Sequence, residues 1–91
     1  MRMIERRLLR LNDRLAELRE EETLVAGELE MHRHLHDDAA RDAAVYDVPV
    51  ERLNERDTSL DVTRFERALV RIRTQIEQVE AKRRRLLIRL G

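Results

Sequence analysis

Residues 4–18 read IERRLLRLNDRLAEL, and their apolar side chains recur in alternating steps of four and three. The same spacing continues to residue 43, along a seam of more than five heptads. The seam consists of Ile4, Leu8, Leu11, Leu15, Leu18, Glu22, Val25, Leu29, His32, His36, Ala39 and Ala43. Such a sustained period is typical of a helix that packs lengthwise against another helix in a coiled coil. We therefore predict one helix over about residues 3–45.

A second seam of the same period occupies the last third of the chain. It consists of Val62, Phe65, Leu69, Ile72, Ile76, Val79, Arg83, Leu86 and Leu90. Pro49 interrupts helical pairing, and Thr58 to Asp61 have the spacing of a capping box. We therefore predict a connecting tip over about residues 46–57, with Val50 and Leu53 facing inward, and a second helix over about residues 58–90. The expected fold is all-α: a single domain over residues 1–91 forming an antiparallel two-helix coiled-coil hairpin, which a second copy can complete to a four-helix bundle.

The composition excludes several classes of protein. Charged residues make up 42% of the chain, there are only two aromatic residues, and there is no Cys, so disulfides and thiolate zinc sites are excluded. No apolar run is long enough to span a bilayer, and the first residues lack a signal-peptide pattern, so we expect a cytoplasmic protein without a membrane partner. Ser59 is the only Ser and no Gly-rich loop is present, so we expect neither an enzyme nor a cofactor.

The net charge of zero conceals a strong polarity along the chain. Residues 1–19 carry a net charge of +3, residues 20–61 of −9, and residues 62–91 of +6. Folding back would place Arg2, Arg6, Arg7 and Arg10 across from the run Lys82 to Arg85 and from Arg89. This basic end suits phosphates, but the scarcity of aromatic residues argues against specific nucleic-acid recognition. Solvated helix faces are the simpler interpretation.

Two charged residues interrupt the seams and suggest a register. Pairing Glu22 with Arg83 as a buried ion pair centres the turn near residue 52. An alternative register, shifted by one heptad, faces Leu8 with Leu90 and turns at Pro49. The first is preferred because a buried charge without a partner costs several kcal/mol.

The preferred register leaves apolar side chains without a partner. It extends Ile4, Leu8 and Leu11 past the second helix, and a further apolar row flanks the first seam. The predicted interaction surface is therefore Ile4, Leu8, Leu9, Leu11, Leu24, Met31 and Leu35. We expect a protein–protein interaction module that forms a homodimer or serves as a small adaptor or subunit of a larger assembly. A lone hairpin with a frayed amino terminus is the alternative.

Two clusters have side chains that can bind ions. His32 and His36 share one helix face and could ligate one metal ion, but two ligands do not make a site, so we expect no metal and favour a polar layer of the seam as the explanation of this pair. An acidic tip is predicted from Asp47, Glu51, Glu55 and Asp57, which suits a basic surface or a metal ion, or is simply a solvated loop.

Residues 63–68, which read TRFERA, resemble the opening of the second hairpin helix in DksA/TraR-type regulators of bacterial RNA polymerase. That family carries an Asp-x-x-Asp-x-Ala motif at its tip, and residues 54–59 match it only at Asp57. Its four-Cys zinc finger has no counterpart in this sequence. The resemblance implies transcription regulation, with the acidic tip near the catalytic centre of RNA polymerase.

Overall fold

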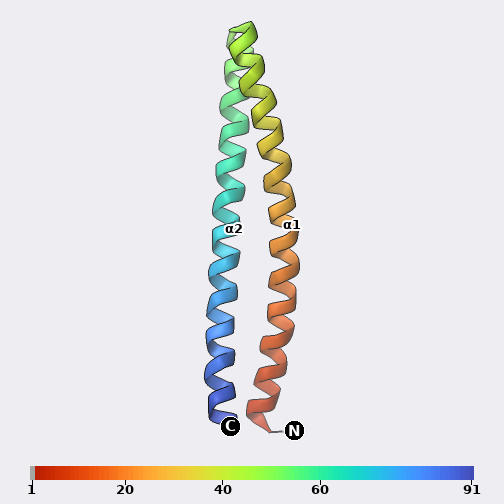
Figure 1. Cartoon of the computed structure of the whole chain (residues 1–91), viewed down its shortest axis with the longest axis vertical. Helices are drawn as coiled ribbons and strands as arrows, with labels where there is room; N and C mark the ends of the chain where they lie inside the picture. Colours follow the sequence, from red (N-terminus) through yellow and green to blue (C-terminus); the bar gives the residue numbers. More distant parts are fainter. Residues whose placement is uncertain (1) are drawn as a thin grey trace. The chain divides into compact units, whose positions relative to one another are not determined.

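The computed structural model describes residues 2–91 and contains two helices, α1 (Met3–Tyr46) and α2 (Pro49–Leu90). They pack against each other as an all-α helical hairpin without strands in this described part of the chain, which confirms the predicted fold class (Figure 1). The chain divides into two compact units. Unit 1 comprises Met1–Thr23 and Val70–Gly91, and unit 2 comprises Leu24–Leu69.

A two-residue connection joins the helices in unit 2. Asp47 has a φ of 44°, in the left-handed region, and its N–H donates to the carbonyl of Ala43 over 3.0 Å. This arrangement is the αL cap that ends many helices. Val48 directly precedes α2, and its carbonyl accepts from the N–H groups of Glu51 at 3.1 Å and Arg52 at 3.2 Å, which are the first backbone hydrogen bonds of that helix. Pro49 occupies the first helical position, where no amide donor is needed.

The predicted connecting tip over residues 46–57 is therefore wrong, and α2 begins at Pro49 rather than near Thr58. The sequence interpretation treated Pro49 as the end of a helix, although proline also starts one. The hydroxyl of Thr58 lies 2.9 Å from the carbonyls of Asn54 and Glu55, so it bonds inside a helix and caps none.

The left-handed conformation of Asp47 restricts which residues can replace it. Asp47→Val is expected to lower the free energy of unfolding by about 1–2 kcal/mol, because a β-branched residue is strained in the left-handed region. Asp47→Gly is the control and should lie within about 0.5 kcal/mol of the parent, since glycine adopts this conformation freely and the exposed Asp47–Arg52 ion pair contributes little. Urea unfolding measures both, and equal losses would contradict the assignment.

The core of unit 1 consists of buried aliphatic side chains from both helices. They are Leu15, Leu18, Ile72, Ile76 and Leu86, of which Leu18 is 0% exposed. Polar pairs connect the two helices at the edge of this core. Arg73 Nε donates to Glu22 Oε2 over 3.0 Å, and Arg83 Nε donates to Asn12 Oδ1 over 2.8 Å.

These pairs correct the predicted register. Glu22 and Arg83 do not form a buried ion pair, because Glu22 bonds with Arg73 and Arg83 bonds with Asn12. No charged residue of the described chain is buried. Glu22 and Arg83 each bond with a polar side chain at the solvent-facing edge of the core. The free-energy cost of burying an unpaired charge, on which the preferred register was based, therefore does not arise. The alternative register, with its turn at Pro49, agrees with the observed connection.

The core of unit 2 combines small and polar side chains. Leu29, Ala39, Ala43 and Leu69 are buried, and the two alanines permit close approach of the helices. In the same unit, the His32 ring of α1 stacks on the Phe65 ring of α2 with a centroid separation of 4.5 Å. His36 Nδ1 lies 3.0 Å from the Thr58 hydroxyl oxygen.

Candidate functional site

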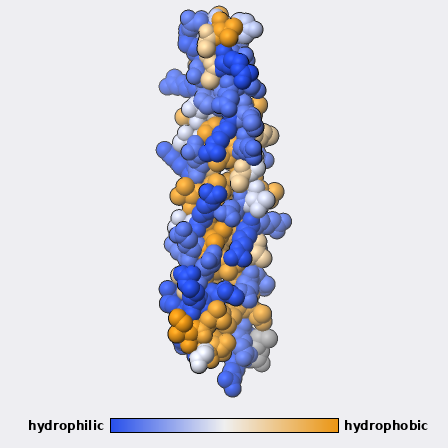
Figure 2. All heavy atoms as spheres, viewed as in Figure 1, coloured by the Kyte–Doolittle hydropathy of each residue, from blue (hydrophilic) through white to orange (hydrophobic). Residues whose placement is uncertain are grey.

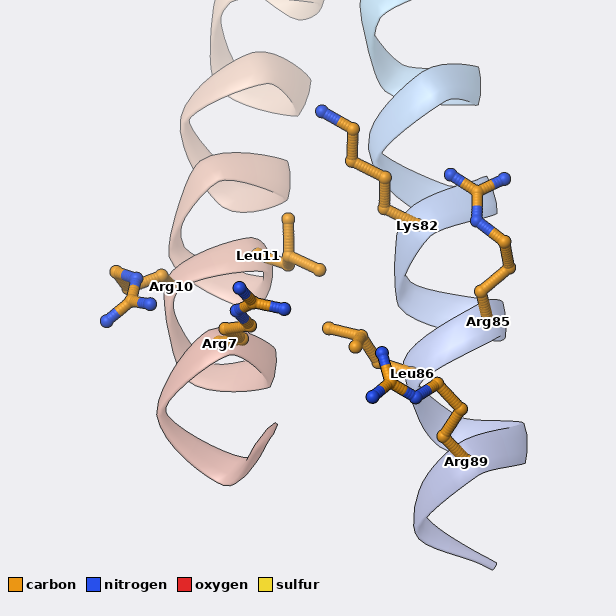
Figure 3. A pocket seen from close by; sticks show the side chains of 7 residues that line it. All are labelled: Arg7, Arg10, Leu11, Lys82, Arg85, Leu86 and Arg89. Carbon is orange, nitrogen blue, oxygen red and sulfur yellow. The ribbon is translucent and has the colours of Figure 1, made fainter. Parts of the chain in front are cut away.

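A groove in unit 1 combines an apolar floor with basic walls (Figure 3). Its volume is about 400 Å³. Leu11 of α1 and Leu86 of α2 point toward one another and form the floor. Five exposed cationic side chains surround them: Arg7, Arg10, Lys82, Arg85 and Arg89.

Helical spacing explains why these residues meet. Arg7, Arg10 and Leu11 lie three and four positions apart on α1, so they share one face. Lys82, Arg85, Leu86 and Arg89 repeat this spacing on α2. The antiparallel packing of unit 1 brings the two faces together, since the start of α1 lies beside the end of α2 (Figure 1).

The groove is strongly electropositive. Residues 2–12 and 81–91 together carry nine basic side chains and one carboxylate, Glu5. Glu5 accepts a hydrogen bond from the backbone N–H of Arg2 over 3.3 Å. None of the ion pairs formed within residues 2–91 includes a side chain of the groove. The five cations are therefore available to an anionic partner.

Exposed apolar side chains accompany the groove in unit 1. Met3, Leu9, Leu87, Ile88 and Leu90 are exposed, and Ile88 has the largest exposed fraction, at 77%. Figure 2 shows hydrophobic atoms beside hydrophilic ones at the lower end of the view. Figure 1, in the same view, places the start of α1 and the end of α2 there. A partner that binds here meets both apolar and cationic groups.

The residues of the predicted interaction surface differ in their exposure. Leu9, Leu24, Met31 and Leu35 are exposed, each by 48% or more. Ile4, Leu8 and Leu11 are only partly exposed, and Leu11 faces α2 across the groove. They do not extend past the second helix, because the observed register places the end of α2 beside the start of α1.

His32 and His36 act as half-buried packing groups in unit 2. His32 Nε2 lies 3.9 Å from Glu28 Oε2, and its ring stacks on Phe65. The Thr58 hydroxyl is within hydrogen-bond distance of His36 Nδ1, at 3.0 Å, and of the Asn54 and Glu55 carbonyls, at 2.9 Å each. Within residues 2–91, no three His, Asp or Glu side chains are grouped closely enough to hold a metal ion.

The acidic residues predicted for the tip do not form a loop. Only Asp47 lies in the connection, where its Oδ1 accepts from Arg52 Nη1 over 2.7 Å. Glu51, Glu55 and Asp57 belong to α2, and Glu51 and Glu55 are only partly exposed. Residues 54–59, which carry the match to the family motif, also lie inside α2 rather than at the tip.

Sequence reasoning also missed an exposed face of α2. Val50, Leu53 and Leu60 are 66%, 57% and 62% exposed, although Val50 and Leu53 were expected to face inward. Asp57 lies between them in the same spacing of three and four. In a helix that runs without interruption from Pro49, these residues lie on a different face from the seam that contains Thr58, Phe65 and Leu69. The sequence could have shown this exposed face if the helical spacing had been continued back to Pro49.

Comparison with protein-family models, curated proteins and solved structures finds no match for the chain. Neither helix has a stretch apolar enough to cross a membrane, over the residues that the structure describes.

Proposed function

We propose that the chain is a non-enzymatic protein-interaction module, and that the basic groove of unit 1 binds an acidic, amphipathic helix of a protein partner. One observation carries this proposal: a floor formed by Leu11 and Leu86 lies among five cations that have no carboxylate partner in the described chain. Grooves that receive amphipathic helices combine an apolar floor with charged walls.

The apolar floor favours a protein over a nucleic acid. Phosphate binding needs cations and gains nothing from leucine side chains. The two aromatic residues of the chain, Tyr46 and Phe65, belong to unit 2, so no aromatic ring of unit 1 can stack on a base. Burying a leucine of the partner against the floor would contribute about 1.5–3 kcal/mol.

The cations set the charge and orientation of the partner. Complementary charge raises the association rate and selects against basic surfaces more than it raises affinity. The attraction weakens with salt, because the Debye length falls from about 10 Å at 0.1 M to about 3 Å at 1 M ionic strength. The apolar contact is less sensitive to salt, so binding should weaken without disappearing.

Fluorescence anisotropy with three labelled probes tests the proposal. The first probe is a helical peptide with Leu at the seam positions and Glu beside them. The second replaces each Leu by Ser, and the third is a single-stranded oligonucleotide of the same net charge. We expect the Glu/Leu peptide to bind at least about tenfold more tightly than the other two, because only it fills the floor. Equal affinity for the two peptides, or tighter binding of the oligonucleotide, would contradict the proposal.

A further inference from the structure

The exposed face of α2 in unit 2 combines apolar side chains with acidic charge, and this combination is complementary to the basic groove. Val50, Leu53, Asp57 and Leu60 follow one another at steps of three and four, and we name them the acidic stripe. Its three apolar members are more than half exposed. Residues 37–61, which include the stripe, carry eight acidic and three basic side chains. The stripe is thus an amphipathic helical face in an acidic region.

The two units also have equal and opposite charge. Unit 1 contains thirteen basic and eight acidic side chains, and unit 2 contains six basic and eleven acidic ones. Their net charges are therefore +5 and −5. Two copies that place unit 1 of each against unit 2 of the other neutralise both units in one symmetric arrangement.

From this complementarity we propose that the occupant of the basic groove is the acidic stripe of a second copy of the chain. The inference rests on the proposed function and names its partner. Leu53 and Leu60 of one copy would pack on Leu11 and Leu86 of the other, while Asp57 meets the surrounding cations. A two-fold axis repeats the contact, so each homodimer contains two identical grooves, both filled.

Exchanging the charges tests this assignment by light scattering coupled to size exclusion. The groove variant carries Arg85→Glu and Arg89→Glu. The stripe variant carries Asp57→Arg together with Asp61→Arg, since Asp61 is partly exposed and lies one helical turn beyond Asp57. The parent should have twice the 10.9 kDa of one chain at about 50 mM salt. Its dimer dissociation constant should rise at least about tenfold at about 500 mM salt. Each variant alone should be a monomer, and an equimolar mixture should again form a dimer.

The mixture distinguishes pairing from unfolding, because two variants that had merely lost their fold could not restore each other. Circular dichroism of each variant checks helicity directly. A monomeric parent at low salt, or a mixture that stays monomeric while both variants remain helical, would overturn the self-pairing. If the Glu/Leu peptide still binds a monomeric parent, the proposed function stands and only this inference fails. If the peptide does not bind either, the proposed function fails with it.

Discussion

Replacing Leu18 by Ala is expected to lower the free energy of unfolding by about 2–5 kcal/mol. Leu18 is 0% exposed and lies in the unit 1 core between α1 and α2. Truncation removes the transfer free energy of its methyl groups and leaves a cavity that two packed helices can close only in part. Small domains are stable by only about 5–15 kcal/mol, so this loss is a large fraction of the total.

Leu24→Ala provides the matched control. It makes the same chemical change on the same helix, but Leu24 is 66% exposed, so the effect should stay within about 0.5 kcal/mol. Urea unfolding followed by circular dichroism measures both variants. Similar losses at the two positions would show that the faces of α1 are not oriented as described.

Reversing two charges of the groove is expected to weaken binding of the Glu/Leu peptide about a hundredfold, which corresponds to about 2.7 kcal/mol. Arg85 and Arg89 lie one helical turn apart beside the floor residue Leu86. Arg85→Glu with Arg89→Glu replaces attraction by repulsion at both positions, and like charges across an interface cost several kcal/mol. Most of the loss should appear as a slower association and should diminish at high salt.

The control for this variant changes the net charge by the same amount elsewhere. Arg33 and Arg71 are exposed and lie outside the groove and outside every ion pair within residues 2–91. Arg33→Glu with Arg71→Glu should therefore change the affinity by less than about threefold, through the overall field alone. An equal loss in both double variants would mean that the peptide responds to net charge and not to the groove.

The helical period of the sequence was enough to predict the fold class and the first helix. The register was not predictable in the same way, because apolar side chains repeated every seven residues fit one another after a shift of one heptad. The choice depended on where the chain turns and on whether Glu22 and Arg83 are buried. The position of the turn and the burial of these two side chains both depend on tertiary context. In the structure, a two-residue connection that includes Asp47 sets the register, and the partners of Glu22 and Arg83 follow from that register.

The cations of the candidate site could be predicted from the sequence, but its apolar floor could not. Its cations, Arg7, Arg10, Lys82, Arg85 and Arg89, belong to the two basic segments that the sequence predicts to lie across from each other. Its floor was not predicted, because the incorrect register left Leu11 without a partner. The acidic stripe was missed because residues 46–57 were assigned to a connection. A spacing of three and four residues places Val50, Leu53 and Asp57 on one face only if the segment is a continuous helix.

Backbone chemical shifts of the isotopically labelled chain, recorded during titration with the Glu/Leu peptide, test whether the basic groove is the binding surface. We expect the largest changes on the two faces that line the groove, residues 7–11 and 82–89. Under the proposed self-pairing, smaller changes at residues 50–60 should accompany them, as the peptide displaces the acidic stripe of the second copy. Largest changes on the row formed by Leu24, Met31 and Leu35, with the groove unaffected, would contradict the assignment of the groove as the binding surface.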